Sequence, residues 1–167
     1  MLKEVDGDIW KLQGDKWVVV PINGYVRQDG KLTMGAGMAR TFVDRYSSED
    51  IQEQLGKAVS VVGLQVYVNP HLRVFAFPSK IHWQDDASLE LIKESATQIK
   101  LMAEALDLDK GSILMPRVGC GNGKLEWAAV KPLLEATLDD RFVIVNKPKM
   151  GGKKWRSPAH SSPLSYP

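Results

Sequence analysis

Short apolar runs alternate with segments of helical periodicity along this chain, and that alternation limits the fold more than any other feature. Lys16 to Pro21 holds an unbroken apolar stretch, which is typical of a strand buried on both faces. Similar runs predict further strands at 61–68, 73–77, 112–115 and 142–145. Apolar residues also recur at intervals of three and four from Leu89 to Leu106, which indicates an amphipathic helix.

Shorter segments complete this pattern. A second helix is predicted to begin within 36–38 and to run to about Tyr46. We expect a short helical turn at 125–130 and a separate helix at 133–138, with Pro132 in its first turn because proline lacks the donor that an interior position needs. Asp85 or Asp86 is expected to cap the helix that follows them. Strands alternating with helices predict an α/β fold built on a layered sheet.

Composition narrows the class of protein further. The 167 residues are 44% hydrophobic, which suits one domain with a proper core. We expect a domain at 1–146 and a Pro-, Ser-, Gly- and Lys-rich tail at 147–167. The tail holds five basic residues and no acid, whereas the rest of the chain holds 17 basic and 20 acidic residues. The body is therefore not a nucleic-acid binder by bulk charge, and the tail either binds phosphates or is simply solvated.

The sequence gives no sign of membrane insertion or secretion. No apolar run approaches the roughly 18–20 residues that span a bilayer, and the charged first ten residues do not resemble a signal peptide. Cys120 is the single cysteine, so no internal disulfide can form. No Cys/His cluster has metal-ligand spacing. We therefore expect a cytoplasmic protein with no membrane partner, no metal and no cofactor.

Two glycine-rich loops are candidates for phosphate binding. One is Met34-Gly35-Ala36-Gly37-Met38, before a predicted helix, and the other is Arg117-Val118-Gly119-Cys120-Gly121-Asn122-Gly123, after a predicted strand. Glycines at such places let backbone N–H groups approach an anion, and a helix dipole favours negative charge there. Neither loop is a Walker motif, because Gly-Lys-Ser/Thr is absent, and Arg40 breaks the dinucleotide fingerprint.

Taken together, these motifs make the chain resemble the macrodomain family. The resemblance covers about Val5 to Val145 and rests on three motifs, which are Gly7-Asp8-Ile9, Asn23 with 34–39 and Phe42, and 116–121 with Leu125-Glu126-Trp127. It is closest to the branch of terminal ADP-ribose protein glycohydrolases and DarG-type DNA ADP-ribosyl glycohydrolase antitoxins, which are paired with DarT toxins. The segment 77–83 is particularly similar to the antitoxin pattern. The resemblance implies a three-layer α/β/α sandwich with a mixed central sheet.

The resemblance also implies a binding site for ADP-ribose. Asp8 would contact the adenine amino group, the two glycine-rich loops would hold the pyrophosphate, and the Asn23 amide would hold hydroxyls of the distal ribose. Cys120 has no suggestively spaced histidine and is interpreted as a small filler in its loop. The predicted ADP-ribose-binding residues are Asp8, Ile9, Asn23, Met34, Gly35, Ala36, Gly37, Met38, Arg117, Val118, Gly119, Cys120, Gly121, Asn122 and Gly123.

Lys80 is the predicted catalytic residue, because it matches the lysine associated with catalysis in that branch. A glycosidic bond breaks through an oxocarbenium-like state that a nucleophile can trap. A lysine amine attacks only when unprotonated, and burial favours that form. Lys80 follows an apolar strand, which permits such burial. The alternative is a surface lysine that only balances phosphate charge.

One position departs from the protein-directed relatives, which carry an Asp where this chain has Gly123. The departure favours a substrate of the nucleic-acid type or another conjugate over a protein ester. If an acid is still required, Asp29, Asp85 and Glu126 are candidates. His82 and Trp83 follow Lys80, and they either stack on a base or on the adenine, or Trp83 packs the following helix.

The leading hypothesis is an ADP-ribosyl glycohydrolase that removes ADP-ribose from nucleic acid or a related conjugate. The first alternative is another reaction in the same pocket, either dephosphorylation of ADP-ribose 1''-phosphate or deacetylation of O-acetyl-ADP-ribose. The second is a non-enzymatic ADP-ribose reader. The expected partners are ADP-ribose or an ADP-ribosylated macromolecule, with DNA among the candidates, and a toxin partner stays open.

Overall fold

The computed structural model describes residues 1–147, so the predicted tail lies outside the described residues except for Lys147. Strands and helices alternate along this part of the chain. The strands are β1 (Lys3–Asp6), β2 (Trp17–Ile22), β3 (Tyr67–Asn69), β4 (Val74–Pro78), β5 (Ile113–Met115) and β6 (Phe142–Asn146). The helices are α1 (Ile9–Leu12), α2 (Gly37–Arg45), α3 (Ile51–Val61), α4 (Leu89–Ala105) and α5 (Trp127–Thr137).

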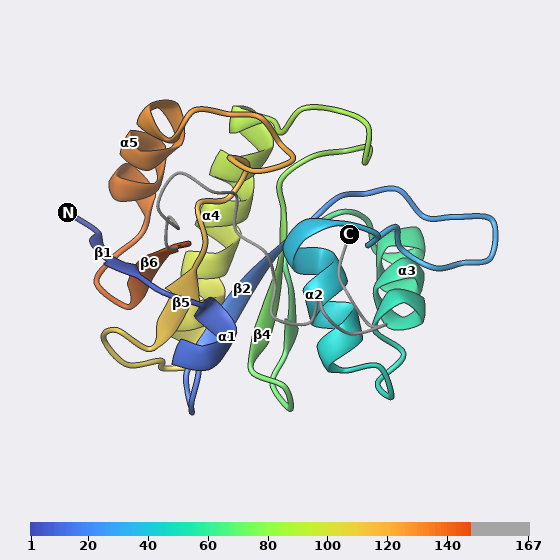
Figure 1. The fold of residues 1–167 in the computed structure, drawn as a ribbon, viewed down its shortest axis with the longest axis horizontal. Helices are drawn as coiled ribbons and strands as arrows, with labels where there is room; N and C mark the ends of the chain where they lie inside the picture. The colour runs from blue at the N-terminus through green and yellow to red at the C-terminus, as the bar shows by residue number, and fades with distance from the viewer. Residues whose placement is uncertain (148–167) are drawn as a thin grey trace, which may run out of the picture.

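All of these strands belong to one mixed sheet. Their order is β1-β6-β5-β2-β4-β3, with β3 antiparallel to β4 and the other neighbouring pairs parallel. The carboxyl ends of the parallel strands therefore lie along one edge of the sheet. In Figure 1 the loops after β4 and β5 lie at the top, and the loop after β2 extends to the right. This edge is where an α/β sheet is expected to bind ligands.

Helices cover both faces of the sheet, which confirms the predicted three-layer sandwich (Figure 1). On one face, Ile92 and Ile99 of α4 and Leu134 of α5 pack with Phe75 and Phe77 of β4. The other face carries a second apolar cluster, to which α1, α2 and α3 contribute. Successive residues of β2 and β4 alternate between the two clusters because successive side chains of a strand point to opposite faces.

The strand predicted at 61–68 is wrong for most of its length. Val61 ends α3, a helix that the sequence reading missed, and only Tyr67 and Val68 of that range lie in a strand. Val61 and Val62 are 75% and 62% exposed, so this β-branched pair does not fill a buried strand. The buried residues of α3 are only Ile51 and Gly56, which leaves too weak an apolar stripe for periodicity to detect.

Two predictions about helix ends are also corrected. α5 is one continuous helix with Pro132 in its interior, and not a turn followed by a separate helix. Pro132 and Ala128, whose carbonyl loses its helical donor, are both exposed, so water can satisfy that carbonyl. The N-cap of α4 is Ser88 rather than Asp85 or Asp86, since the Ser88 hydroxyl accepts from the backbone N–H of Leu91 at 3.2 Å.

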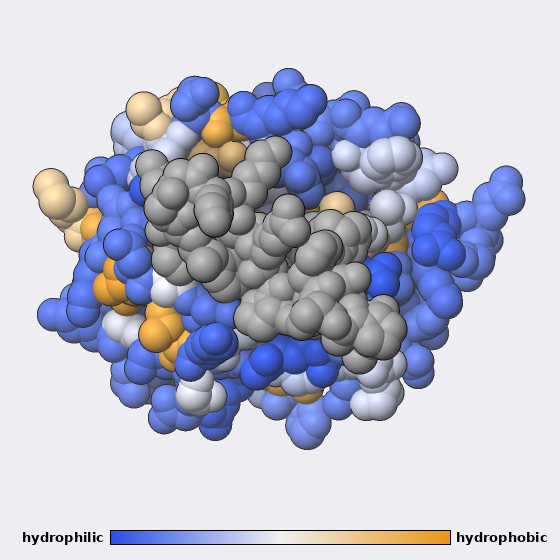
Figure 2. All heavy atoms as spheres, viewed as in Figure 1, coloured by the Kyte–Doolittle hydropathy of each residue, from blue (hydrophilic) through white to orange (hydrophobic). Residues whose placement is uncertain are grey.

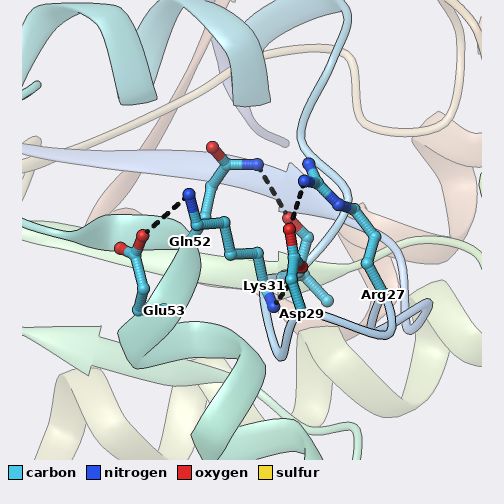
Figure 3. A network of polar contacts seen from close by, with 6 residues as sticks. Arg27, Asp29, Lys31, Gln52 and Glu53 are labelled. Carbon is cyan, nitrogen blue, oxygen red and sulfur yellow. Dashed lines mark hydrogen bonds and ion pairs between the residues drawn. The ribbon is translucent and has the colours of Figure 1, made fainter.

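The insertion after β2 forms a small hairpin that is fastened to α3 (Figure 3). Backbone N–H of Leu32 donates to the Gln52 carbonyl at 2.9 Å, and the Gln52 side chain returns a hydrogen bond to the Leu32 carbonyl at 3.0 Å. Lys31 forms an ion pair with Glu53 at 3.2 Å. Arg27 pairs with Asp29 within the hairpin. These contacts fix the loop that follows Asn23.

Gly56 is the residue that lets the hairpin lie so close to α3. A Cβ atom built at Gly56 would lie 1.9 Å from the Gly30 carbonyl oxygen and 2.9 Å from the Leu32 nitrogen. Both neighbours are backbone atoms, which cannot yield by rotating a side chain. The hairpin and helix therefore depend on a glycine at this helical position, although glycine is a poor helix former.

We expect Gly56→Ala to lower the free energy of unfolding by about 1–3 kcal/mol, because the new methyl group displaces the hairpin backbone. Urea denaturation followed by circular dichroism measures the change. Ser60→Ala, at an exposed position of the same helix, is the control and should leave the midpoint nearly unchanged. A gain in stability for Gly56→Ala, as helix propensity alone would give, would contradict the close packing described here.

Candidate functional site

Four loops at the carboxyl edge of the sheet form the candidate site, and they follow β1, β2, β4 and β5. The loops after β2 and β4 are joined by a backbone hydrogen bond from the Gly24 N–H to the Ile81 carbonyl at 2.8 Å. Another links the loops after β4 and β5, from the Ala87 N–H to the Gly123 carbonyl at 2.9 Å. A Cβ at Gly37 would lie 3.2 Å from the Asn122 side-chain nitrogen. The structure thus brings the two predicted glycine-rich loops together.

The loop before α2 presents its backbone to solvent. Gly35, Ala36 and Gly37 are exposed, and in the described part of the chain no side chain caps the helix at Ala36. The N–H groups of the first turn of α2 are therefore available to an anion. Gly37 has φ of 58°, a left-handed conformation that favours glycine. Met34, a predicted ligand contact, is only 2% exposed and belongs to the apolar core.

The three glycines after β5 serve different purposes. A Cβ at Gly123 would lie 2.5 Å from the Gly119 carbonyl oxygen and 2.6 Å from the Ala87 Cβ. Close packing against backbone therefore requires the glycine at 123, whereas Gly119 is favoured by its left-handed φ of 78°. Gly121 has no atom within 4 Å of the corresponding position and is exposed, so its backbone faces open space.

The glycine at position 123 therefore has a structural role of its own. In this backbone an aspartate at position 123 would collide with the Gly119 carbonyl, so the loop is closed around a glycine. The other candidate acids stand elsewhere. Asp29 pairs with Arg27 in the hairpin, and its pKa is lowered chiefly by the hydrogen bond from the Lys31 backbone N–H. A carboxyl with a lowered pKa stays ionised at neutral pH and is a poor proton donor.

Lys80 lies two residues beyond the end of β4 and is half-buried. Its Nζ donates a hydrogen bond to the Trp83 carbonyl at 3.0 Å, which folds the side chain over the turn 80–83. Within residues 1–147 no hydrogen bond or ion pair joins Lys80 to a carboxylate. Asp85 lies on the same loop and is exposed, and Glu126 is the N-cap residue of α5.

The Asn23 side chain forms hydrogen bonds within the loop that follows β2. The amide Nδ2 donates to the Thr33 carbonyl at 2.9 Å, and Oδ1 accepts from the Tyr25 backbone N–H at 2.9 Å. The side chain is 8% exposed and closes the base of the hairpin. One amide hydrogen and one lone pair stay available for a further partner, so a structural role and a ligand contact are compatible.

The loop after β1 positions Asp8 at the start of α1. Its Oδ1 accepts from the Trp10 backbone N–H at 3.0 Å, which makes Asp8 the N-cap residue. Ile9 is 8% exposed and packs in the core, so its side chain is structural. The second carboxylate oxygen of Asp8 has no hydrogen bond within residues 1–147.

Arg117 points away from the glycine-rich loop that it begins. Its Nε donates to the Asn146 side-chain oxygen at 2.7 Å, and its guanidinium lies 5.2 Å from the ring centroid of Trp127. Glu4 of β1 lies 3.7 Å from the same guanidinium. Arg117 therefore ties β5 to the β1–β6 side of the edge. The sequence placed it among the phosphate-binding residues and gave no sign of this direction.

Tyr25 is the neighbour of Lys80 that the sequence reading missed. Its ring lies 4.5 Å from the His82 ring, between centroids, and His82 lies 5.7 Å from the Trp83 ring. Tyr25 and Trp83 are 41% and 47% exposed. In the sequence, the one reason to expect Tyr25 in the site was its position two residues after Asn23. Its contact with His82 depends on the pairing of β2 with β4.

Other features of the described residues carry no comparable chemistry. An apolar cavity of about 250 Å³ lies between α3 and the β3–β4 hairpin, away from these loops. Residues 1–147 contain no group of three or more His, Cys, Asp or Glu side chains placed to hold a metal. None of the helices in that range has the length and hydrophobicity to cross a membrane. The surface visible in Figure 2 is mostly hydrophilic, with small separate hydrophobic patches.

Comparison with known proteins agrees with this architecture. No protein-family model matches the chain. The macrodomain of Thermus aquaticus DarG is 27% identical with a TM-score of 0.70, over 89% of this chain and 99% of that one. The structure of Thermosipho africanus DarTG in complex with ADP-ribose has a TM-score of 0.69 at 19% identity, over 93% of this chain and 43% of that one.

A curated protein is also similar in sequence. The DNA ADP-ribosyl glycohydrolase of Thermus aquaticus is 31% identical over 115 residues, which is 64% of this chain and 31% of that protein. The chain therefore spans about a third of the length of this curated relative. The fold and these likenesses define the class: the chain has the macrodomain fold that its motifs predicted. Within that class it is similar to the macrodomain of DarG.

Cys120 is half-buried between the two glycines of its loop, and it offers a direct test of the geometry of that loop. Burial raises the pKa of its thiol, Glu126 also raises it, and Arg117 opposes both effects. We expect iodoacetamide to react with Cys120 several-fold more slowly than with N-acetylcysteine at pH 8, because less thiolate is present. The difference should shrink as pH rises and both thiols ionise.

Protein unfolded in urea is the control for this measurement and should react at the rate of the model thiol. The chain has a single cysteine, so mass spectrometry of the alkylated protein reports this site alone. Equal rates for folded protein and model thiol at pH 8 would show that the loop does not enclose Cys120.

Proposed function

We propose that this macrodomain binds ADP-ribose and cleaves its glycosidic bond to a nucleic acid or related conjugate. The observation that carries the proposal is the order of groups along the sheet edge. Asp8 follows β1 at one side, the glycine-rich loops follow β5 and β2 in the middle, and Lys80 follows β4. Four strand spacings separate β1 from β4, or about 19 Å. That span suits a long ligand with a base at one end and a ribose at the other.

The proposed assignment follows this order. Asp8 accepts from the adenine amino group with its second oxygen, and the N–H groups at the start of α2 and around Gly121 bind the pyrophosphate. Asn23 and Lys80 then lie with the distal ribose. Support comes from the relatives, of which one is a DNA ADP-ribosyl glycohydrolase and another was solved with ADP-ribose.

Lys80 supplies the proposed chemistry. Its unprotonated amine forms a bond to the anomeric carbon of the distal ribose as the bond from that carbon to the nucleic acid breaks. The electron pair of the broken bond leaves with the nucleic acid, which takes a proton from solvent. Water then hydrolyses the lysine adduct, which releases ADP-ribose and restores the amine. The close packing at Gly123 supports a mechanism without an aspartate at that position.

We expect Lys80→Ala to reduce the release of ADP-ribose from ADP-ribosylated single-stranded DNA by at least 100-fold, because the attacking amine is lost. Binding of free ADP-ribose, measured by calorimetry, should change by less than about threefold. Lys110→Ala is the control, since that exposed lysine precedes β5 at the opposite edge of the sheet. Undiminished release by Lys80→Ala would overturn the catalytic role of Lys80. Tight binding of ADP-ribose by the wild type without any turnover would instead show that the protein is a non-enzymatic ADP-ribose reader.

Asp8 allows the adenine contact to be separated from helix capping. Asparagine caps a helix as well as aspartate does, so Asp8→Asn should keep the melting temperature of the wild type. With Oδ1 used by the cap, its remaining group is a donor and not an acceptor. We expect the Kd for ADP-ribose to rise about tenfold, in line with a lost charge-assisted hydrogen bond.

Ribose 5-phosphate, which lacks adenine, is the control ligand for this variant and should bind it and the wild type equally. Asp8→Ala completes the comparison, since it should lower both stability and ADP-ribose affinity. An unchanged ADP-ribose Kd for Asp8→Asn would remove Asp8 from the adenine site.

A further inference from the structure

The rings of Tyr25, His82 and Trp83 form a contiguous aromatic cluster beside Lys80. Tyr25 comes from the loop after β2, whereas His82 and Trp83 come from the loop after β4. The Tyr25 and His82 centroids are 4.5 Å apart, and these two rings are tilted by 55°. The His82 and Trp83 rings are stacked, with centroids 5.7 Å apart and an interplanar angle of 28°. We name these three side chains the aromatic platform.

The aromatic platform does not serve the apolar core. None of its three residues belongs to either apolar cluster of the described chain, and Tyr25 and Trp83 keep 41% and 47% of their surface exposed. Trp83 is therefore not part of the apolar core that α4 shares with the sheet. The exposed rings of Tyr25 and Trp83 offer π faces to a planar ligand.

Backbone contacts fix the platform next to the proposed ribose site. The Trp83 carbonyl accepts from Lys80 Nζ, and the Tyr25 N–H donates to the Asn23 side chain. A hydrogen bond between the Gly24 N–H and the Ile81 carbonyl joins the two loops that carry the rings. The platform therefore lies on the β4 side of the edge, whereas Asp8 follows β1 at the far side. A ring held by the platform is thus not the adenine of ADP-ribose.

Charge selects the kind of ligand that fits. Asp85 and Asp86 follow the platform directly and are both exposed. Their carboxylates repel a phosphate but not a neutral aromatic ring. Base–aromatic stacking stabilises single-stranded nucleic acids on proteins by about 1–3 kcal/mol per base. A nucleobase therefore fits this surface better than a phosphodiester does.

We propose that Tyr25, His82 and Trp83 stack against an unpaired nucleobase of the substrate, next to the distal ribose. This inference rests on the proposed function, since it assumes that ADP-ribose occupies the edge with its distal ribose at Lys80. It makes the platform a specificity-determining surface that favours single-stranded, base-containing conjugates. In a duplex both faces of a base are already stacked, so a paired strand cannot use it.

The test compares binding of two ligands in the Lys80→Arg background, which lacks the attacking amine but keeps a side-chain donor for the Trp83 carbonyl, so turnover does not consume the ligands. One is free ADP-ribose, and the other is a single-stranded DNA oligonucleotide carrying one ADP-ribose on a base. We expect the oligonucleotide to bind about tenfold more tightly, which corresponds to about 1.4 kcal/mol. Adding Trp83→Ala should abolish this advantage without changing the Kd for ADP-ribose, and Trp83→Phe should restore most of it.

Ile81→Ala is the matched control, because Ile81 lies on the same loop, is 61% exposed and contributes only its backbone to the loop contacts. It should keep the oligonucleotide advantage. Annealing a complementary strand should remove the advantage from the protein with Trp83 intact. The inference is overturned if Trp83→Ala retains the advantage, if Ile81→Ala loses it equally, or if the duplex binds as well as the single strand.

The outcome also separates this inference from the proposed function. Failure to bind ADP-ribose at all would overturn both. Normal ADP-ribose binding and turnover by the wild type, together with an unaltered oligonucleotide advantage in the Trp83→Ala variant, would overturn the platform alone.

Discussion

The parallel pairing of β2 with both β4 and β5 is the constraint on which the site depends. It places the ends of three strands side by side, so the loops that leave them must meet. The hairpin after β2, the Lys80 loop and the glycine-rich loop after β5 then share backbone hydrogen bonds and close contacts. The site is therefore built first by sheet register and only afterwards by individual side chains.

Close approach of backbones is the second condition. Gly56 lets the hairpin touch α3, and Gly119 and Gly123 let the loop after β5 close against Ala87. Backbone atoms exclude a larger residue at Gly56 and Gly123, and the positive φ of Gly119 favours glycine there. At position 123 this packing leaves no room for an aspartate side chain in the observed backbone.

Several residues with predicted ligand roles also hold the protein together. Asp8 caps α1, and Asn23 closes the hairpin, yet each keeps hydrogen-bonding capacity for a ligand. The contact that stabilises the fold also fixes the side chain that we propose as a ligand contact, so the group would be pre-organised for binding. Arg117 is different, since its guanidinium is engaged by Asn146 and stacks near Trp127.

The sequence by itself determined the fold class, the strands β2, β4, β5 and β6, and the long helix α4. Their apolar residues are continuous or strictly periodic, and burial of such patterns is decided locally. The glycines before α2 and after β5 also predicted phosphate binding there, and the resemblance to macrodomains predicted a catalytic role for Lys80; both roles stay predictions. The helix α3 and the continuity of α5 were missed, because their apolar stripes are weak or interrupted by Pro132.

Only the tertiary structure decided which side chains face one another. It placed Tyr25 against His82, turned Arg117 toward Asn146, and gave Gly123 a steric reason. These relations join residues that are far apart in the chain, and they arise from strand register and loop packing. Local propensity carries no information about such contacts, which is why the chemistry of the macrodomain edge became visible only in three dimensions.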